Sequence, residues 1–351
     1  MKRKTVAILG ATGTVGQRFI QLLDGHPWLD VAAVAASERS VGKSYASACT
    51  WRLPTPIPQA VEPMTVQSLD PRQFDGIDLV FSALPADAAR DIEPAFAEAG
   101  MAISSNASAY RFADDVPLLV PEVNADHASL IDVQRRQRDW SGLLVTNPNC
   151  TTTGIVLALK PLSDAFGLKT VMATSMQAVS GAGYPGVSSF DALDNVLCLI
   201  PGEEEKMERE ARILLGQVTD ERLVEAPFLL SAQTNRVPVI DGHTICLSLK
   251  FEQPATPEEA TRVLVEFRGA EAAHNLPSSP AVPLVVRSEA DRPQPRLDRD
   301  AGAGMQVSVG RIRKCPVFDL RLVVVVHNTI RGAAGGSILN SELLIHQGYI
   351  R

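Results

Sequence analysis

The stretch TVAILGATGTVG, residues 5–16, decides the fold of this chain. Its first five residues are an apolar run typical of a buried strand, and glycines follow at positions 10, 13 and 16 as helical spacing begins. Glycines spaced in this way let the backbone turn tightly and approach a pyrophosphate, which then rests on the helix N-terminus. Strand, turn and helix in this order predict a dinucleotide-binding unit. The residues expected to line its phosphate site are Gly10, Thr12, Gly13, Thr14 and Val15.

The chain after this unit continues to alternate strands and helices. Apolar runs at 31–36, 79–83 and 101–104 predict further strands, and helical spacing appears at 15–23 and 86–99. Such alternation predicts an α/β fold with a parallel sheet covered on both faces.

A second, β-rich part begins near residue 146. Long runs at 171–179, 244–251 and 320–326 predict one sheet of a second domain. Segment 291–305 shows no periodicity of its own. Segment 335–345 has helical spacing, and we expect it to pack back on the first domain.

Composition excludes several classes of protein. The 351 residues, 45% hydrophobic and 21% charged, suffice for two globular domains. A net charge of -7 argues against a nucleic-acid surface, which needs a basic stripe. The five cysteines form no CxxC pair or Cys/His cluster, so neither structural zinc nor a disulfide framework is expected. No apolar run reaches the length of a membrane span and no export signal is present, so the cytoplasm is the expected location.

The end of the second predicted strand bears on the choice of dinucleotide. It reads Ala36-Ser37-Glu38-Arg39-Ser40. Ser37, Arg39 and Ser40 can receive a 2′-phosphate, with Arg39 supplying the charge. Glu38 can instead hold the 2′-hydroxyl of NAD. The pattern favours NADP and leaves NAD open.

Cys150 is the candidate nucleophile. It lies in TNPNCTTTG, residues 146–154, just before a helical pattern that begins near Thr153. A helix N-terminus stabilises a thiolate, and free backbone N–H groups there, with Asn149, can hold an oxyanion on the reacting carbon. A lone cysteine is more often a buried structural residue. Cysteine beside a nicotinamide site, however, is a known chemical pairing.

Ten stretches in order resemble aspartate-semialdehyde dehydrogenase, in particular the archaeal and fungal branch of that family. The resemblance runs nearly end to end, which is far more specific than any one motif. The stretches are GATGTVGQRF at 10–19, ASERSVGK at 36–43, SNASAYR at 105–111, PLLVPEVN at 117–124, TNPNCTT at 146–152, MQAVSGAGYPG at 176–186, EEEKME at 203–208, NRVPVIDGH at 235–243, RPQPRLDR at 292–299 and HNTIRGAAGG at 327–336.

The resemblance implies a division into two domains. A Rossmann-like NADP-binding domain would span 1–147 and be completed by a C-terminal helix over 328–351. A catalytic and dimerisation domain would span 148–327, with a mixed sheet like that of glyceraldehyde-3-phosphate dehydrogenase. Its exposed sheet face would form a homodimer, and a homotetramer stays open.

The resemblance also implies the reaction. It is the reversible, NADP-dependent, phosphorylating oxidation of L-aspartate 4-semialdehyde to L-4-aspartyl phosphate, run reductively in lysine, methionine and threonine biosynthesis. Cys150 would attack the aldehyde, His243 would exchange the proton as hydride leaves, and phosphate would release the thioester. His327 is the competing histidine, but it ends an apolar strand, whereas His243 follows a glycine in an irregular turn. No metal is implied.

The substrate contacts follow from the same resemblance. Arg236 would hold the α-carboxylate as a bidentate pair, and Glu203 would face the ammonium. The other implied contacts are Gln177 for the acyl group, Lys206 and Arg111 for phosphate, and Ser180, Gly181 and Asn328 for the cofactor. Without the family, Glu203 and Lys206 are better explained as an i, i+3 pair on a solvated helix.

Two alternatives belong to other functions. An acyl-CoA reductase, such as malonyl-CoA reductase, shares the cysteine and NADPH but tends to lack the NPNC and EEEK features. A non-catalytic dinucleotide sensor would leave Cys150, Gln177, Arg236 and His243 together unexplained. In a sensor, Cys150 would react with iodoacetamide no faster than the other four cysteines.

Overall fold

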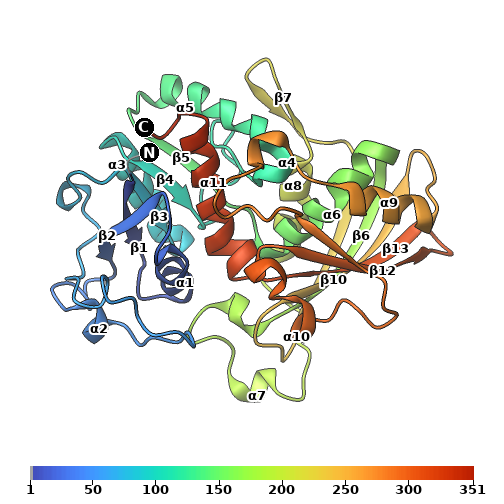
Figure 1. Cartoon of the computed structure of the whole chain (residues 1–351), viewed down its shortest axis with the longest axis horizontal. Helices are drawn as coiled ribbons and strands as arrows, with labels where there is room; N and C mark the ends of the chain where they lie inside the picture. The colour runs from blue at the N-terminus through green and yellow to red at the C-terminus, as the bar shows by residue number, and fades with distance from the viewer. Residues whose placement is uncertain (1–2) are drawn as a thin grey trace.

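The computed structural model describes residues 3–351, which form two large sheets set side by side and a separate two-stranded sheet, β7-β8 (Figure 1). The first sheet is wholly parallel, with strand order β2-β1-β3-β4-β5. Its strands are β1 (Lys4–Leu9), β2 (Leu29–Ala35), β3 (Leu79–Ser82), β4 (Ala102–Ser105) and β5 (Leu143–Thr146). The α/β architecture expected from the first 120 residues is confirmed.

Helices cover both faces of this sheet because its strands are apolar on both sides. On one face, Val6 and Ile8 pack with Phe19 of α1 (Thr14–Leu23) and Ile338 of α11 (Gly335–His346). On the other face, β1 packs with Phe96 of α3 (Ala86–Glu98). Buried strands of this kind are typical of doubly covered parallel sheets.

The end of the chain returns to the first sheet, as the sequence predicted. Helix α11 contacts α1, α4 (Pro121–Asn124) and β4, and Figure 1 shows it between the two sheets. The expected single helix over 328–351 is wrong in its bounds. A π-helical turn, η6 (Ile330–Ala334), precedes α11, and the helix ends at His346.

The second sheet is mixed and has strand order β11-β12-β13-β10-β6-β9. The β11–β12 and β6–β9 pairs are parallel and the other three pairs are antiparallel. Its strands are β6 (Leu168–Gln177), β9 (Leu229–Arg236), β10 (His243–Phe251), β11 (Leu284–Arg287), β12 (Val307–Lys314) and β13 (Leu320–Val326). The three β-rich runs therefore belong to one sheet, as expected.

Within residues 3–351, helices cover only one face of the second sheet. The helices α6 (Cys150–Phe166), α8 (Glu203–Leu214) and α9 (Pro257–Glu266) pack on it around a continuous apolar core. On the opposite face, Met172 and Leu229 stay 51% and 68% exposed. An exposed sheet face that carries apolar side chains is the kind of surface that a second chain covers.

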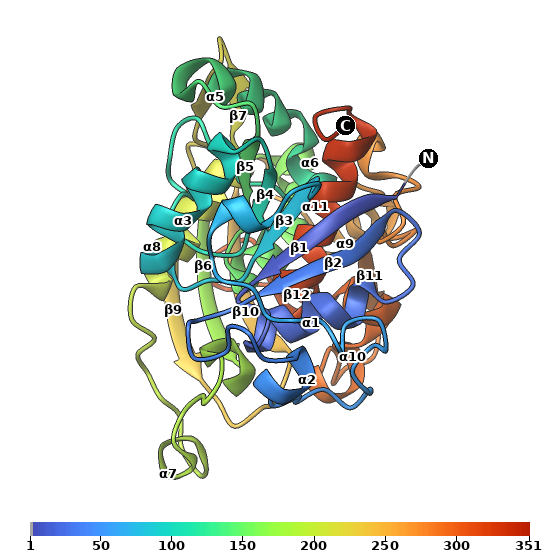
Figure 2. The same cartoon turned by 90° about the vertical axis from the view of Figure 1, so that its left-hand side faces the viewer.

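Shorter elements connect these layers. The segment 291–305, a loop without periodicity in the sequence, contains the short elements α10 (Pro295–Asp298) and η5 (Ala301–Gly304). Figure 2 shows α7 (Ser189–Ala192) projecting from the body of the molecule. The remaining elements are α2 (Tyr45–Ala48), η1 (Pro71–Gln73), η2 (Ala125–Ser129), α5 (Leu130–Arg138), η3 (Val179–Ala182), β7 (Gln217–Thr219), β8 (Arg222–Val224) and η4 (Glu271–Ala273). Among the described residues no helix is long and apolar enough to cross a membrane.

Candidate active site

A cavity of about 610 Å³ lies where the carboxyl ends of the parallel strands meet the start of α6. Ligands bind at this edge of an open α/β sheet because the loops that follow the strands converge there. The cavity brings together the phosphate turn, the loops after β3 and β4, Cys150, and the loop after β6. Candidate site residues that line it are Gly13, Thr14, Val15, Arg111, Asn149, Cys150, Ser180, Gly181, Glu203, Lys206, Arg236 and Asn328.

Cys150 is the first residue of α6, three residues earlier than the helical pattern suggested. Its environment differs from the electropositive one that the helix N-terminus alone predicted. Burial, with a smaller contribution from the Glu203 carboxylate, raises the pKa of the Cys150 thiol to about 12. Arg111 and Arg236 act in the opposite direction but do not overcome burial. Cys150 is therefore a thiol in the resting protein at neutral pH.

His243 faces this thiol. Its Nε2 lies 3.2 Å from the Cys150 sulfur, and its Nδ1 accepts a hydrogen bond from the Ala178 backbone N–H at 3.0 Å. A backbone N–H can only donate, so Nδ1 is unprotonated and the neutral ring carries its proton on Nε2, directed at the sulfur. Burial, and then the nearby Arg236 charge, lower the pKa of His243 to about 3. The resting pair is therefore neutral.

Asn149 caps α6 instead of pointing freely at the reacting carbon. Its Oδ1 accepts hydrogen bonds from the backbone N–H groups of Thr151 and Thr152, at 2.8 and 3.2 Å. Its Nδ2 donates to Glu203 at 2.7 Å. The Asn149 carbonyl therefore holds the helix start and one amide hydrogen is bonded to Glu203, which leaves only the second amide hydrogen for the expected oxyanion role.

Arg111 lines the cavity and forms a buried ion pair with Glu210. Its Nη1 lies 2.9 Å from Glu210 Oε1, and its Nη2 donates to the Asn106 carbonyl at 2.8 Å. Glu210 also accepts the Asn149 backbone N–H at 2.6 Å. Glu210 therefore joins a candidate phosphate ligand to the residue before the nucleophile. Sequence reasoning missed it because it lies in a run of charges, EEEKMEREA, that reads as a solvated face.

The substrate-binding candidates Arg236, Glu203 and Lys206 meet at the same cavity. Arg236 ends β9 and donates from Nη1 to the Ala178 carbonyl at 2.9 Å. Glu203 begins α8 and is 8% exposed, so it does not lie on the solvent-exposed face of this helix. Gln177 ends β6 nearby, is 1% exposed, and donates to Ser175 at 3.2 Å. Gln177 lies outside the set of residues that line the cavity.

Ser180, Gly181 and Asn328 connect the nucleophile to the cofactor side of the cavity. Asn328 donates to the Ser180 hydroxyl at 2.8 Å and accepts the Gly242 N–H at 2.9 Å. A Cβ on Gly181 would lie 2.8 Å from Arg236 Nη1 and 3.2 Å from His243 Cε1. A larger residue at position 181 would therefore displace the Arg236 guanidinium or crowd the His243 ring.

The phosphate turn is built for close approach. Gly10 has φ +73°, and a Cβ there would lie 2.6 Å from the Ala83 carbonyl oxygen. Gln17 holds the turn by donating to the Thr12 carbonyl at 3.0 Å. No side chain caps the N-terminus of α1, where Gly13 stands at the N-cap, so the first N–H groups of the helix face the cavity without a side-chain acceptor.

The residues expected at the adenosine ribose lie away from the cavity. Ser37 and Arg39 are exposed, Ser40 is half-buried, and none of them lines it. Lys43 Nζ donates to the Arg39 carbonyl at 2.8 Å, so a second cation stands beside Arg39. Sequence reasoning passed over Lys43, although it belongs to the motif ASERSVGK.

The side chain of His327, the competing histidine, faces Asp300. It is 3% exposed, and burial lowers its pKa to about 4. Its Nε2 lies 3.8 Å from an Asp300 carboxylate oxygen. The His327 backbone carbonyl accepts the N–H of Gly332, a cavity-lining residue, at 3.0 Å, but its side chain makes no hydrogen bond to Cys150.

Matches to known proteins place these features in a family. Residues 5–131 match the family described as "Semialdehyde dehydrogenase, NAD binding domain", and residues 159–331 match "Semialdehyde dehydrogenase, dimerisation domain". Aspartate-semialdehyde dehydrogenase of Archaeoglobus fulgidus is 51% identical over 99% of this chain and 100% of its own length. That of Schizosaccharomyces pombe is 47% identical over 99% of both chains. The chain belongs to the aspartate-semialdehyde dehydrogenase family.

Solved structures agree with this membership. The crystal structure of aspartate semialdehyde dehydrogenase with NADP from Candida albicans superimposes with a TM-score of 0.92, at 44% identity, over 99% of this chain and 100% of that one. Aspartate semialdehyde dehydrogenase II from Vibrio cholerae gives 0.77 at 27% identity, over 98% and 99%. The family resemblance and the fold class expected from the sequence are therefore confirmed.

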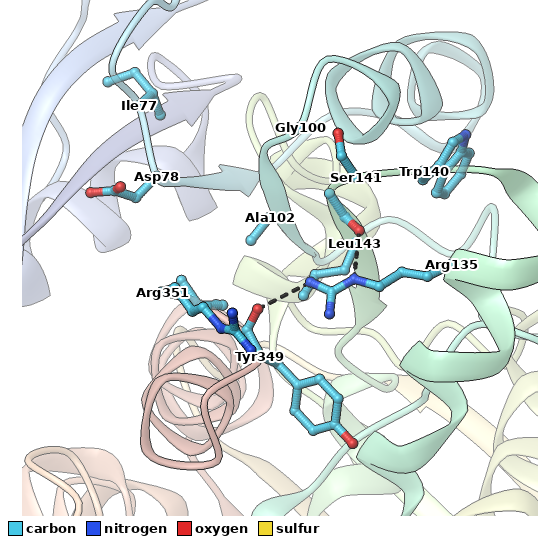
Figure 3. A pocket seen from close by; sticks show the side chains of 12 residues that line it. Ile77, Asp78, Gly100, Ala102, Arg135, Trp140, Ser141, Leu143, Tyr349 and Arg351 are labelled. Atoms are coloured by element: carbon cyan, nitrogen blue, oxygen red, sulfur yellow. Dashed lines mark hydrogen bonds between the residues drawn. The ribbon is translucent and has the colours of Figure 1, made fainter.

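A second cavity of about 520 Å³ lies at the opposite, amino-terminal edge of the first sheet of this aspartate-semialdehyde dehydrogenase family member. Figure 3 shows its polar lining, where Arg135 donates to the carbonyls of Gly142 and Tyr349 at 3.2 and 3.1 Å. No cysteine or histidine lines it. Over residues 3–351 no group of three His, Cys, Asp or Glu side chains is arranged to hold a metal ion. Of the two cavities, only the first is lined by Cys150, the residue that His243 contacts.

Proposed function

We propose that this chain interconverts L-aspartate 4-semialdehyde and L-4-aspartyl phosphate with NADP and inorganic phosphate, in the biosynthesis of lysine, methionine and threonine. The observation that carries this proposal is the cavity that joins the phosphate turn to Cys150, with His243 Nε2 at 3.2 Å from the sulfur. The curated relatives that carry the name aspartate-semialdehyde dehydrogenase align over nearly the whole chain and support it.

The residues around the turn fit a dinucleotide phosphate. The uncapped N-terminus of α1 offers backbone N–H donors, and the glycines leave space for a pyrophosphate against them. Gly10, Thr12, Gly13, Thr14 and Val15 would hold it, with Ser180, Gly181 and Asn328 on the nicotinamide side. When bound, the nicotinamide supplies or accepts the hydride at the carbon that Cys150 carries.

The 2′-phosphate of NADP would meet Ser37, Arg39 and Ser40. The proximity of Lys43 to Arg39 adds a second positive charge at this place. The Candida albicans relative was solved with NADP, which supports the same preference here. Glu38, exposed beside Arg39, would weaken binding of a 2′-phosphate unless the two cations outweigh it.

Cys150 would perform the covalent step. Its sulfur adds to the aldehyde carbon to give a thiohemiacetal, and loss of hydride from that carbon leaves a thioester. Phosphate then attacks the thioester carbonyl, and the bond to sulfur breaks to release aspartyl phosphate and the thiolate. Because Asn149 caps the helix through its Oδ1, the oxyanion would be held by the Asn149 Nδ2 hydrogen left free by Glu203 or by the backbone N–H of Cys150.

His243 would donate from Nε2 to the oxygen of the reacting carbonyl and act as the acid and base. Because the Ala178 N–H occupies Nδ1, a doubly protonated ring would set two N–H groups against each other. Because Nε2 already carries a proton, uptake of the thiohemiacetal proton at Nε2 requires that the ring proton first move to Nδ1, for which the bond from Ala178 must be given up.

Each charged group of the cavity would bind a different part of the substrates. Arg236 would bind the α-carboxylate and Glu203 the ammonium, while Arg111 and Lys206 hold phosphate. The Glu210 carboxylate leaves Arg111 only part of its hydrogen-bonding capacity, since Nη1 is already paired. Gln177 would turn toward the acyl group only after releasing Ser175.

We also propose how the chain divides into two domains. Residues 1–147 with the C-terminal segment 328–351 would form the NADP-binding domain, and 148–327 the catalytic and dimerisation domain. The match of 159–331 to a dimerisation domain, and the exposed face of the second sheet, support a homodimer. We propose that it acts in the cytoplasm. Pairing of dimers into a homotetramer would leave this face unchanged.

The test is a spectrophotometric assay of purified protein with aspartate semialdehyde, phosphate and NADP. We expect NADPH absorbance to appear only when phosphate is present. NADPH oxidation with malonyl-CoA, and no reaction with aspartate semialdehyde, would move the assignment to an acyl-CoA reductase. NADP binding without either reaction would favour a sensor.

A further inference from the structure

The motif RPQPRLDR, residues 292–299, has no part in the proposed mechanism, yet the structure places it against the turn before His243. Arg299 Nη1 donates to the Asp241 carbonyl at 2.9 Å. A Cβ built on Gly242 would lie 3.0 Å from Pro295 Cβ and 3.1 Å from Arg299 Cβ. The motif therefore packs directly on the residue that precedes the histidine.

A buried carboxylate holds the motif itself in place. Asp298 is 1% exposed and lies 2.7 Å from Arg287 Nε and 2.7 Å from Arg292 Nε. It also accepts the Gln294 backbone N–H at 2.7 Å. These contacts fix the short helix α10 to β11 and to the preceding loop, so Arg299 projects from a rigid base.

The turn before His243 is held from its other side as well. Gly242 has φ +98°, which glycine adopts without strain, and its N–H donates to Asn328 at 2.9 Å. The Ile240 carbonyl accepts the Ser180 N–H at 3.2 Å. Asp241, between these two anchored residues, has its carbonyl held by Arg299.

We propose that Arg299 is a positioning residue for His243. By holding the Asp241 carbonyl against α10, it sets where β10 begins and hence the separation between His243 Nε2 and the Cys150 sulfur. This inference rests on the proposed role of His243. The physical reason is that a catalytic pair works only near its productive geometry, so a displacement of about 1 Å can cost about a hundredfold in rate.

Steady-state kinetics of Arg299→Ala and Arg299→Lys test the proposal, with Arg296→Ala as the matched control. Arg296 lies in α10, which Arg299 follows as the C-cap residue; it is exposed, and its side chain makes no hydrogen bond or ion pair in the described structure. We expect Arg299→Ala to lower kcat by about tenfold to a hundredfold, with KM for NADP and phosphate changed less than about twofold. Arg299→Lys should recover part of kcat, because an ammonium can donate to the same carbonyl.

A double-variant cycle separates positioning from general loss of structure. If Arg299 acts through His243, adding Arg299→Ala to a His243→Asn protein should cost nothing further in kcat. A full additional loss in that background, or an Arg299→Ala kcat equal to that of Arg296→Ala, would overturn the proposal. Failure of the proposed function looks different, since the unmodified protein would then show no phosphate-dependent NADPH formation.

Discussion

His243 Nε2 lies 3.2 Å from the Cys150 sulfur while the Ala178 backbone N–H donates to Nδ1 of the same ring. The contact from Ala178 fixes which nitrogen of the His243 ring carries the proton. It makes His243 a hydrogen-bond donor to the sulfur in the resting protein, not a base already holding the thiol proton. Burial acts in the same direction, since it raises the pKa of the thiol and lowers that of the imidazole.

Replacement of the nucleophile should separate chemistry from cofactor binding. We expect Cys150→Ser to abolish phosphate-dependent turnover, since a hydroxyl is far less nucleophilic than a thiolate. NADP binding should be unchanged, because the phosphate turn does not contact this side chain. Turnover by the assay above and NADP binding by calorimetry check both halves. Residual turnover near that of the unmodified protein would contradict the thioester mechanism.

Alkylation of Cys150 should be slow in the ligand-free protein. With the pKa of its thiol raised to about 12, the thiolate fraction grows steadily with pH, and the iodoacetamide rate should rise without a plateau up to about pH 10. Cys198 is exposed. Burial raises the pKa of the Cys315 thiol, but hydrogen bonds from backbone N–H groups to its sulfur lower it by more, so that its pKa is lowered overall. Cys198 and Cys315 should therefore be alkylated first.

Peptide mapping of the alkylated protein measures this order. A plateau for Cys150 below about pH 8 would show a stabilised thiolate and contradict the raised pKa. Slow alkylation without ligand therefore does not by itself indicate a non-catalytic sensor. Turnover of the Cys150→Ser protein decides that question.

Arg39 should set the preference for NADP. We expect Arg39→Ala to weaken NADP binding by about tenfold or more and NAD binding by less than about twofold, because only NADP carries the 2′-phosphate. Dissociation constants for both dinucleotides measure it, with Arg72→Ala, an exposed arginine paired to Asp70, as the control. Equal losses for the two dinucleotides would mean that Glu38 or the backbone decides the preference.

Glu93 should make stability fall as pH rises. It is fully buried in α3 and accepts a hydrogen bond from Ser105 at 2.5 Å, and burial raises its pKa from 4.5 to about 7. A folded-state pKa above the unfolded value means that the native state holds the proton more tightly. Its contribution is thus complete below about pH 4.5 and is lost as pH rises toward and past about 7.

Glu93→Gln removes this titration while keeping the shape of the side chain. Between about pH 5 and about pH 8, the unmodified protein should lose up to about 3 kcal/mol of stability relative to the variant. Urea unfolding at several pH values measures the difference. Parallel pH profiles for the two proteins would show that Glu93 is ionised throughout this range.

The sequence by itself determined the elements whose signals are local. Glycine spacing at 10, 13 and 16 after an apolar run predicts the turn, because only glycine permits that backbone at that approach. Strands β1 to β4, β6, β10 and β13 follow from runs of apolar residues for a similar reason, since burial of each run depends on a few neighbours in the chain, whereas β5, β9, β11 and β12 were not predicted. Family membership was also accessible, because ten ordered motifs cover nearly the whole chain.

The tertiary structure alone decided how polar side chains are used. Asn149 and Glu210 belong to sequence patterns typical of a loop and a solvated helix, yet folding buries them beside Cys150, where unpaired polar groups are costly and each must find a partner. The protonated nitrogen of His243 depends on Ala178, 65 residues away, and its turn depends on Arg299, 58 residues from Asp241. Pairings across such separations are set by three-dimensional packing, and no local pattern encodes them.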